Sequence, residues 1–206
     1  MTSIESVTLD VADPTAAGHF YSAAFALGTQ LRLRASEAPT TGFRGFTLSL
    51  VVSQPATVDA LIGPALDAGA TPLKPAAKSL WRYGGAVQAP DGTIWKVATS
   101  AKKDSGPATR QIDQIVLLLG VADVAESKRF YVDRGLAVAK SFGRKYVEFA
   151  TASSAVKLAL YGRRALAKDA GVAPDGTGSH RITIGGDAGP FTDPDGFAWD
   201  VVRSSV

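Results

Sequence analysis

Residues 11–21 read VADPTAAGHFY, and residues 121–131 read VADVAESKRFY. Val-Ala-Asp and Phe-Tyr therefore recur with the same internal separation. A second motif also occurs twice, as PDGTIWKV at residues 90–97 and as PDGFAWDV at residues 194–201. Because both motifs appear in the same order in each half of the chain, the sequence predicts an internal repeat with two similar modules.

The first half has the pattern of an α+β unit. Polar and apolar residues alternate over residues 6–11, which favours a strand with one buried face. Asp13 suits a helix N-cap with Pro14 at the first helical position, and Gly28 is the expected end of this helix. Further elements are expected as strands at 31–34, 46–52, 85–88 and 93–98 and a helix at 57–68.

The second half repeats this pattern in a shortened form. A helix is expected over residues 124–134, ended by Gly135. Strands are expected at 114–119, 146–150, 156–161, 181–184 and 197–202. No counterpart of the 57–68 helix is predicted, and the glycine-rich residues 185–189 bridge that gap.

A polar segment separates the two copies. Residues 102–110 read KKDSGPATR and contain both Gly and Pro, which is typical of an exposed connection. We therefore expect an N-terminal module over residues 1–101 and a C-terminal module over residues 111–206.

Composition excludes several classes of protein. Hydrophobic residues make up 46% of the 206 residues and charged residues 20%, which indicates a globular protein with a sizeable core. The net charge of +3 comes from scattered Lys and Arg, which argues against a nucleic-acid partner. The absence of cysteine excludes disulfides and thiolate chemistry. No membrane span or secretion signal is predicted, so a cytoplasmic location is expected.

Together these features resemble the vicinal oxygen chelate superfamily, which includes glyoxalases, bleomycin-resistance proteins and extradiol dioxygenases. The motif residues are Asp13, Phe20, Tyr21, Leu27, Gly28, Pro90, Asp91 and Gly92, and in the second copy Asp123, Phe130, Tyr131, Gly135, Leu136, Asp193, Pro194, Asp195 and Gly196. The resemblance implies an α+β fold of two tandem βαβββ modules, whose curled mixed sheets form a shared cup. Superfamily members differ in chemistry, so the function has to be argued from the site.

The resemblance also implies where metal ligands would stand. Metal-dependent members carry His or Gln on each first strand and Glu on each last strand. Here the first-half positions are Ser6 and Lys96, and a protonated amine cannot bind a cation. In the second half, Gln114 or Val116 takes the first-strand position and Asp200 the last. We therefore expect no cofactor, and a Lys96–Asp200 ion pair in its place.

Any divalent metal would have to use a degenerate set of ligands. The candidates are Gln114, His180 and Asp200. Histidine can also move a proton near neutral pH, so the candidates for catalysis are Lys96, His180 and Asp200.

Strand alternation and loop position predict the ligand-binding side chains. Lys96 and Asp200 are expected to face the cup, with Trp95 and Trp199 facing the core behind them. Residues 81–83 read WRY and precede a strand, where an arginine beside aromatic rings can stack on a planar anion. The predicted ligand-binding set is Ser6, Thr8, Trp81, Arg82, Tyr83, Lys96, Gln114, Tyr146, Tyr161 and Asp200.

Two functions follow from this set. The replaced ligands at Ser6 and Lys96 favour a metal-free protein that binds a small molecule in the cup between the modules. The alternative is a glyoxalase-like enzyme (a lyase, isomerase or dioxygenase) with a degenerate metal site or acid–base residues. The expected partner is a small molecule rather than nucleic acid or a membrane, and both a monomer and a homodimer are compatible with the sequence.

Overall fold

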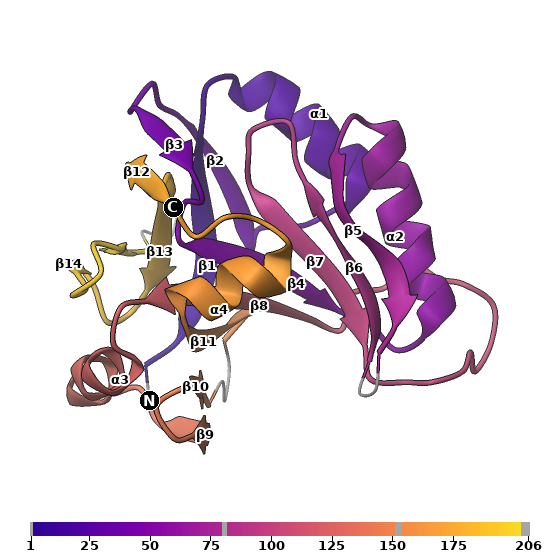
Figure 1. Ribbon diagram of the computed structural model, residues 1–206. Coiled ribbons are helices and arrows are strands. Elements are labelled where there is room, and N and C mark those ends of the chain that lie inside the picture. Colours follow the sequence, from indigo (N-terminus) through magenta and orange to yellow (C-terminus); the bar gives the residue numbers. More distant parts are fainter. Residues whose placement is uncertain (1, 80–81, 151–153, 203–206) are drawn as a thin grey trace.

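The structure, a computed structural model, describes residues 2–79, 82–150 and 154–202 (Figure 1). The helices are α1 (Pro14–Ala24), α2 (Pro55–Asp67), α3 (Val124–Asp133) and α4 (Arg163–Ala170). The strands are β1 (Ile4–Val11), β2 (Leu31–Ala35), β3 (Thr40–Gly42), β4 (Phe46–Val51), β5 (Thr71–Lys78), β6 (Tyr83–Gln88), β7 (Ile94–Thr99), β8 (Gln114–Val121), β9 (Val138–Phe142), β10 (Tyr146–Phe149), β11 (Val156–Gly162), β12 (Gly176–Gly178), β13 (Ile182–Gly186), β14 (Phe191–Thr192) and β15 (Ala198–Val201). No helix in these ranges is long and apolar enough to cross a membrane.

Two complete βαβββ units build an eight-stranded sheet of order β5-β6-β7-β4-β8-β11-β10-β9. The first unit runs from β4 through α2 to β7, and the second from β8 through α3 to β11. In each unit the first strand pairs in parallel with the last, and the two units meet at the antiparallel pair β4 and β8. The predicted α+β fold with repeated βαβββ units and mixed sheets is therefore confirmed.

The two ends of the chain build a second sheet from shortened units. Its order is β14-β15-β13-β1-β2, with β1 antiparallel to β13. The parallel pairs β1·β2 and β13·β15 repeat the first-to-last pairing of the complete units. Each half of the chain thus contributes to both sheets, and the predicted boundary at 102–110 lies between β7 and β8. The division into modules 1–101 and 111–206 stays a prediction.

The repeated motifs contact each other in the core. The Tyr21 hydroxyl donates to Asp91 (2.7 Å), and the Tyr131 hydroxyl donates to Asp193 (2.6 Å). In both copies the buried tryptophan that follows donates to the same tyrosine oxygen at 3.3 Å, Trp95 in the first and Trp199 in the second. Burial and the adjacent carboxylates raise the pKa of both tyrosines well above the usual value, so both remain donors. The motif pairs therefore tie each helix to its hairpin.

Helix α1 begins at the predicted residue but ends earlier than predicted. Asp13 accepts hydrogen bonds from Thr15 N and Ala16 N, as predicted for a cap. The first helix was expected to reach Gly28, but it ends at Ala24. The chain turns at Ala26 instead, with φ of +51°.

Six elements were not predicted: α4, the sheet-edge strands β5 and β9, and the very short strands β3, β12 and β14. β5 and β9 are the two edges of the eight-stranded sheet and carry no buried residues, so no alternating pattern marks them. Pro72 and Pro75 in β5 are tolerated because an edge strand leaves some N–H positions unpaired.

Helix α4 lies on the opposite face of the eight-stranded sheet from α2 (Figure 1). Its residues Leu166, Ala167 and Ala170 are buried against Phe43 and Ile94. The close approach depends on Gly120 of β8, where an added Cβ would lie 3.2 Å from Arg163 Cα. α4 thus covers one part of this sheet face and leaves the rest open.

Candidate functional site

A cavity of about 610 Å³ lies beside α4 on the open part of this face. Both complete units line it, through β4 and β7 from the first and β8 to β11 from the second. It therefore sits over the central β4·β8 pair of the sheet.

The structure brings five of the predicted ligand-binding residues together. The residues that line the cavity are Arg82, Lys96, Gln114, Tyr146 and Tyr161. They come from β7, β8, β10, β11 and the segment before β6, so they are far apart in the sequence. The predicted orientation of Lys96 toward the cavity and of Trp95 toward the core is confirmed.

The other predicted residues lie elsewhere. Tyr83 donates its hydroxyl to Asp59 at 2.8 Å, and Trp81 is outside the described residues. Ser6, Thr8 and Asp200 belong to the five-stranded sheet. The predicted grouping of these three with Lys96 was wrong because β1 and β15 do not join the sheet that contains β7.

Lys96 is held by a carboxylate that was not predicted. Its side chain is 10% exposed and forms an ion pair with Asp169 of α4. Burial lowers the pKa of Lys96, and the attraction of Asp169 only partly offsets this effect. The predicted Lys96–Asp200 pair was therefore wrong, because Asp200 lies on β15 of the other sheet.

A second lysine of the cavity has its own carboxylate. Lys157 Nζ lies 2.9 Å from Glu148 Oε1, and the Tyr146 hydroxyl donates to Glu148 Oε2 at 3.0 Å. Burial alone would raise the pKa of Glu148, but the hydrogen bonds from Lys157 and Tyr146 outweigh it and the pKa is lowered. Glu148 therefore stays ionised, and both of its carboxylate oxygens already accept hydrogen bonds from Lys157 and Tyr146.

Strand register aligns the two lysines across the centre of the sheet. Lys96 is the partner of Ser49, Ser49 of Val116, and Val116 of Lys157. All four residues line the cavity. They form a row across β7, β4, β8 and β11, which we call the central row. The first-strand position beside Lys96 is thus Ser49, not Ser6 as predicted.

The cavity does not suit a divalent metal. Within the described ranges, no group of three or more His, Cys, Asp and Glu side chains has the arrangement of a metal site. The two carboxylates of the cavity, Glu148 and Asp169, each hold a lysine ammonium group. A divalent cation would have to displace both ammonium groups from these carboxylates. The displaced ammonium groups would remain in the same cavity and repel the cation.

His180 has a structural environment away from this cavity. Its Nε2 lies 3.0 Å from the Asp195 carbonyl oxygen, and Nδ1 faces the Arg44 carbonyl oxygen. The ring stacks on Phe197 at a centroid distance of 4.0 Å. The predicted grouping of His180 with Lys96 or Gln114 was wrong, because His180 does not line their cavity and both of its ring nitrogens face backbone carbonyl oxygens.

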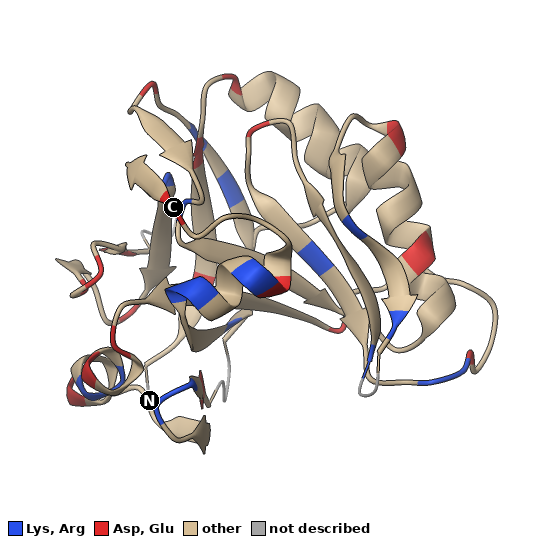
Figure 2. Ribbon diagram, in the orientation of Figure 1, with Lys and Arg blue, Asp and Glu red and all other residues tan. Residues whose placement is uncertain are grey.

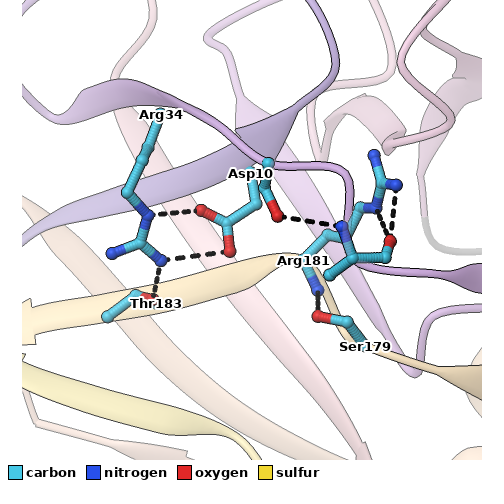
Figure 3. Close-up of polar contacts among 7 residues, drawn as sticks. Asp10, Arg34, Ser179, Arg181 and Thr183 are labelled. Atoms are coloured by element: carbon cyan, nitrogen blue, oxygen red, sulfur yellow. Dashed lines mark hydrogen bonds and ion pairs between the residues drawn. The ribbon is translucent and has the colours of Figure 1, made fainter.

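The five-stranded sheet carries a polar cluster of its own (Figure 3). Arg34 binds both carboxylate oxygens of Asp10, at 2.7 and 3.0 Å, and also the Thr183 hydroxyl at 3.0 Å. The Arg181 carbonyl accepts from Asp10 N, and Arg181 N donates to Ser179 Oγ. The polar groups of this cluster therefore form hydrogen bonds with one another, and they connect β1, β2 and β13.

No protein-family model matches the chain, and no curated protein matches it in sequence. Among solved structures, two variants of glyoxalase I from Zea mays superpose with TM-scores of 0.61 and 0.62 at 15% identity. The match to the first covers 97% of this chain and 91% of the maize chain, and the match to the second 96% and 92%.

The chain has the fold of glyoxalase I. The maize enzyme in another structure gives a TM-score of 0.59 at 14% identity, covering 90% of this chain and 75% of the other. A putative dioxygenase from Bacillus subtilis gives 0.54 at 10% identity, covering 89% and 69%. At these identities the glyoxalase I likeness establishes the fold and leaves the chemistry to the site residues.

Several cavity residues of this glyoxalase I-like chain were missed by the sequence prediction. Glu148 shares a strand face with Tyr146, and Lys157 shares one with Tyr161, so alternation alone could have identified both. Lys140 and Lys145 also line the cavity but lie on or beside the unpredicted strand β9. No sequence pattern identified Asp169 as a cavity residue, because α4 itself was not predicted.

Proposed function

We propose that the protein binds a small organic molecule, without a metal, in the cavity beside α4. The observation that carries this proposal is the central row, where a lysine stands at each end and a protein carboxylate already neutralises each lysine. A volume of about 610 Å³ is in the usual range for small-molecule sites.

The cavity also offers apolar surface for the body of a ligand. Val51, Val116 and Leu118 contribute aliphatic side chains from β4 and β8. Phe142 and Tyr161 flank Tyr146 with ring centroids 6.0 and 6.1 Å away. Phe142 lines the cavity and is 64% exposed, so its ring is available to contact a ligand.

A catalytic role is the second candidate, and its specific observation is the Lys96–Asp169 pair. A buried lysine with a lowered pKa beside a carboxylate can exchange a proton with a bound molecule. In that case turnover of a substrate would depend on Lys96, whereas pure binding would leave the ligand unchanged after incubation.

Elemental analysis and a binding screen together test the proposal. We expect untagged protein, purified without chelator, to carry no stoichiometric divalent metal and to bind small aromatic compounds in a two-dimensional NMR screen. Val116→Phe narrows the cavity and should abolish binding, while Thr8→Val on the other sheet should not affect it. One equivalent of tightly bound metal, or unchanged binding in Val116→Phe, would contradict the proposal.

A further inference from the structure

The cavity wall is strongly basic. Five basic side chains line it (Arg82, Lys96, Lys140, Lys145 and Lys157), against two acidic ones (Glu148 and Asp169). The whole chain has a net charge of only +3, so this one cavity carries an excess as large as that of the entire molecule. Figure 2 shows basic positions on β7 and α4, with an acidic position toward the end of α4.

The positive charge is only partly neutralised by the protein. Each of the two carboxylates is engaged by one lysine of the central row. In the described ranges, the ion pairs include none for Arg82, Lys140 or Lys145. These three exposed cations line the cavity, where they would attract an anion and repel a cation.

The central row places donors where one end of a ligand would lie. Ammonium groups stand at both ends of the row, and Ser49 offers a hydroxyl between them. Gln114 adds an amide from the same face of β8. Charge-assisted hydrogen bonds of this kind are stronger than neutral ones when water is excluded.

We infer that the ligand is a small organic carboxylate, with its anionic group at Lys96 and its apolar body against Val116 and the Tyr146–Tyr161 wall. This inference rests on the proposed function and specifies the class of ligand. The Asp169 side chain, one-third exposed, already places a carboxylate at Lys96. A ligand carboxylate therefore competes with Asp169 for the same ammonium group.

This competition gives two substitutions with opposite expected effects. Lys96→Met removes the ammonium group and should weaken carboxylate binding at least tenfold. Asp169→Asn removes the competing charge and should tighten it several-fold. Lys102→Met in the linker is the matched control and should leave the dissociation constant unchanged.

Matched acids and amides test the charge requirement directly. Benzoate, phenylacetate and 2-naphthoate would be titrated against the full chain by NMR, beside benzamide, phenylacetamide and 2-naphthamide. We expect the acids to shift cavity resonances and to bind at least tenfold more tightly than the amides, with affinity falling as salt is raised.

Each other outcome overturns a defined part of the argument. Amides that bind in the cavity as tightly as the acids would overturn the carboxylate inference and leave the proposed function standing. Binding of neither class at millimolar concentration would overturn both. Weaker acid binding by Asp169→Asn would also overturn the inference, and circular dichroism would show that each variant is folded.

Discussion

The buried position of Lys96 lowers the free energy of unfolding of the protein. Burial lowers its pKa, so the folded protein binds this proton less tightly than the unfolded chain does. That difference reduces stability below the folded pKa of Lys96, and stability recovers as pH rises from there toward the unfolded value near 10.5. A buried charge retained at such a cost is typical of a binding site rather than of a structural core.

We therefore expect Lys96→Met to be as stable as the wild type at pH 7 or more stable, by up to about 1 kcal/mol. Asp169 loses its partner but can be hydrated, because its side chain is one-third exposed. The stability difference should shrink as pH approaches 10.5. Urea unfolding at pH 7 and pH 9.5 measures this, and a loss of about 3 kcal/mol at pH 7 would show that the ion pair is structural.

Glu148 makes the opposite contribution, because its pKa is lowered in the folded protein. Its stabilisation is present above the unfolded value of 4.5 and is lost as pH falls through the folded pKa. Glu148→Gln should thus cost about 1–2 kcal/mol at pH 7, and the difference from wild type should disappear in acid. Unfolding curves at pH 7 and pH 3 measure it, with exposed Glu37→Gln as the control. A pH-independent difference would contradict this assignment.

At the level of single residues, the alternation of side chains along a strand predicted which way residues point. It did not predict which residues form ion pairs. The orientations of Lys96, Trp95 and Trp199 follow from the two-residue period of a strand, and the structure confirms them. The partner of Lys96 could not be predicted, because it depends on which strands share a sheet and on a helix that folds back over that sheet.

Helix α4 is the element that shapes the cavity, and its approach to β8 depends on Gly120. An added Cβ at Gly120 would lie 2.9 Å from the Gly45 carbonyl oxygen and 3.2 Å from Arg163 Cα, and neither backbone atom can move freely. Gly120→Ala should therefore destabilise the protein by about 2 kcal/mol and move α4 away from the cavity.

Denaturant unfolding of Gly120→Ala, together with the NMR shifts of α4, measures both effects. Gly106→Ala is the matched control, because an added Cβ there meets nothing within 4 Å, and it should change stability by less than about 0.5 kcal/mol. If the two variants were equally stable, close packing of α4 on β8 would not be required.

The elements that were predicted have a regular buried face, whereas the missed edge strands β5 and β9 have no buried residues and the missed helix α4 buries only three residues. α2 and β7 have regular apolar spacing and were predicted almost to their ends. Every residue of β9 is exposed, and α4 is a short, charged segment of sequence RRALAKDA. Hydrophobic periodicity reports burial, so edge strands and short capping helices leave little trace in it.

On the scale of the whole molecule, three strand pairs join the two halves of the chain, and one of them is the small two-stranded sheet of β3 and β12. β4 pairs with β8 in the eight-stranded sheet, and β1 pairs with β13 in the five-stranded sheet. The repeat in the sequence predicted two modules, but it could not show that each would be divided between the two larger sheets. The cavity spans the β4·β8 pair, so neither half of the chain contains it alone.

This arrangement predicts the behaviour of a chain cut between Ser105 and Gly106. Residues 1–105 alone would expose β1 and β4 as sheet edges, and residues 106–206 would expose β8 and β13, so we expect each fragment to unfold without cooperativity or to self-associate. Mixed together, the fragments should form a one-to-one complex that unfolds cooperatively, with a midpoint temperature that rises with concentration. Native mass spectrometry and circular dichroism measure both properties. A monomeric fragment with cooperative unfolding would instead identify the segments on either side of residues 102–110 as independent modules.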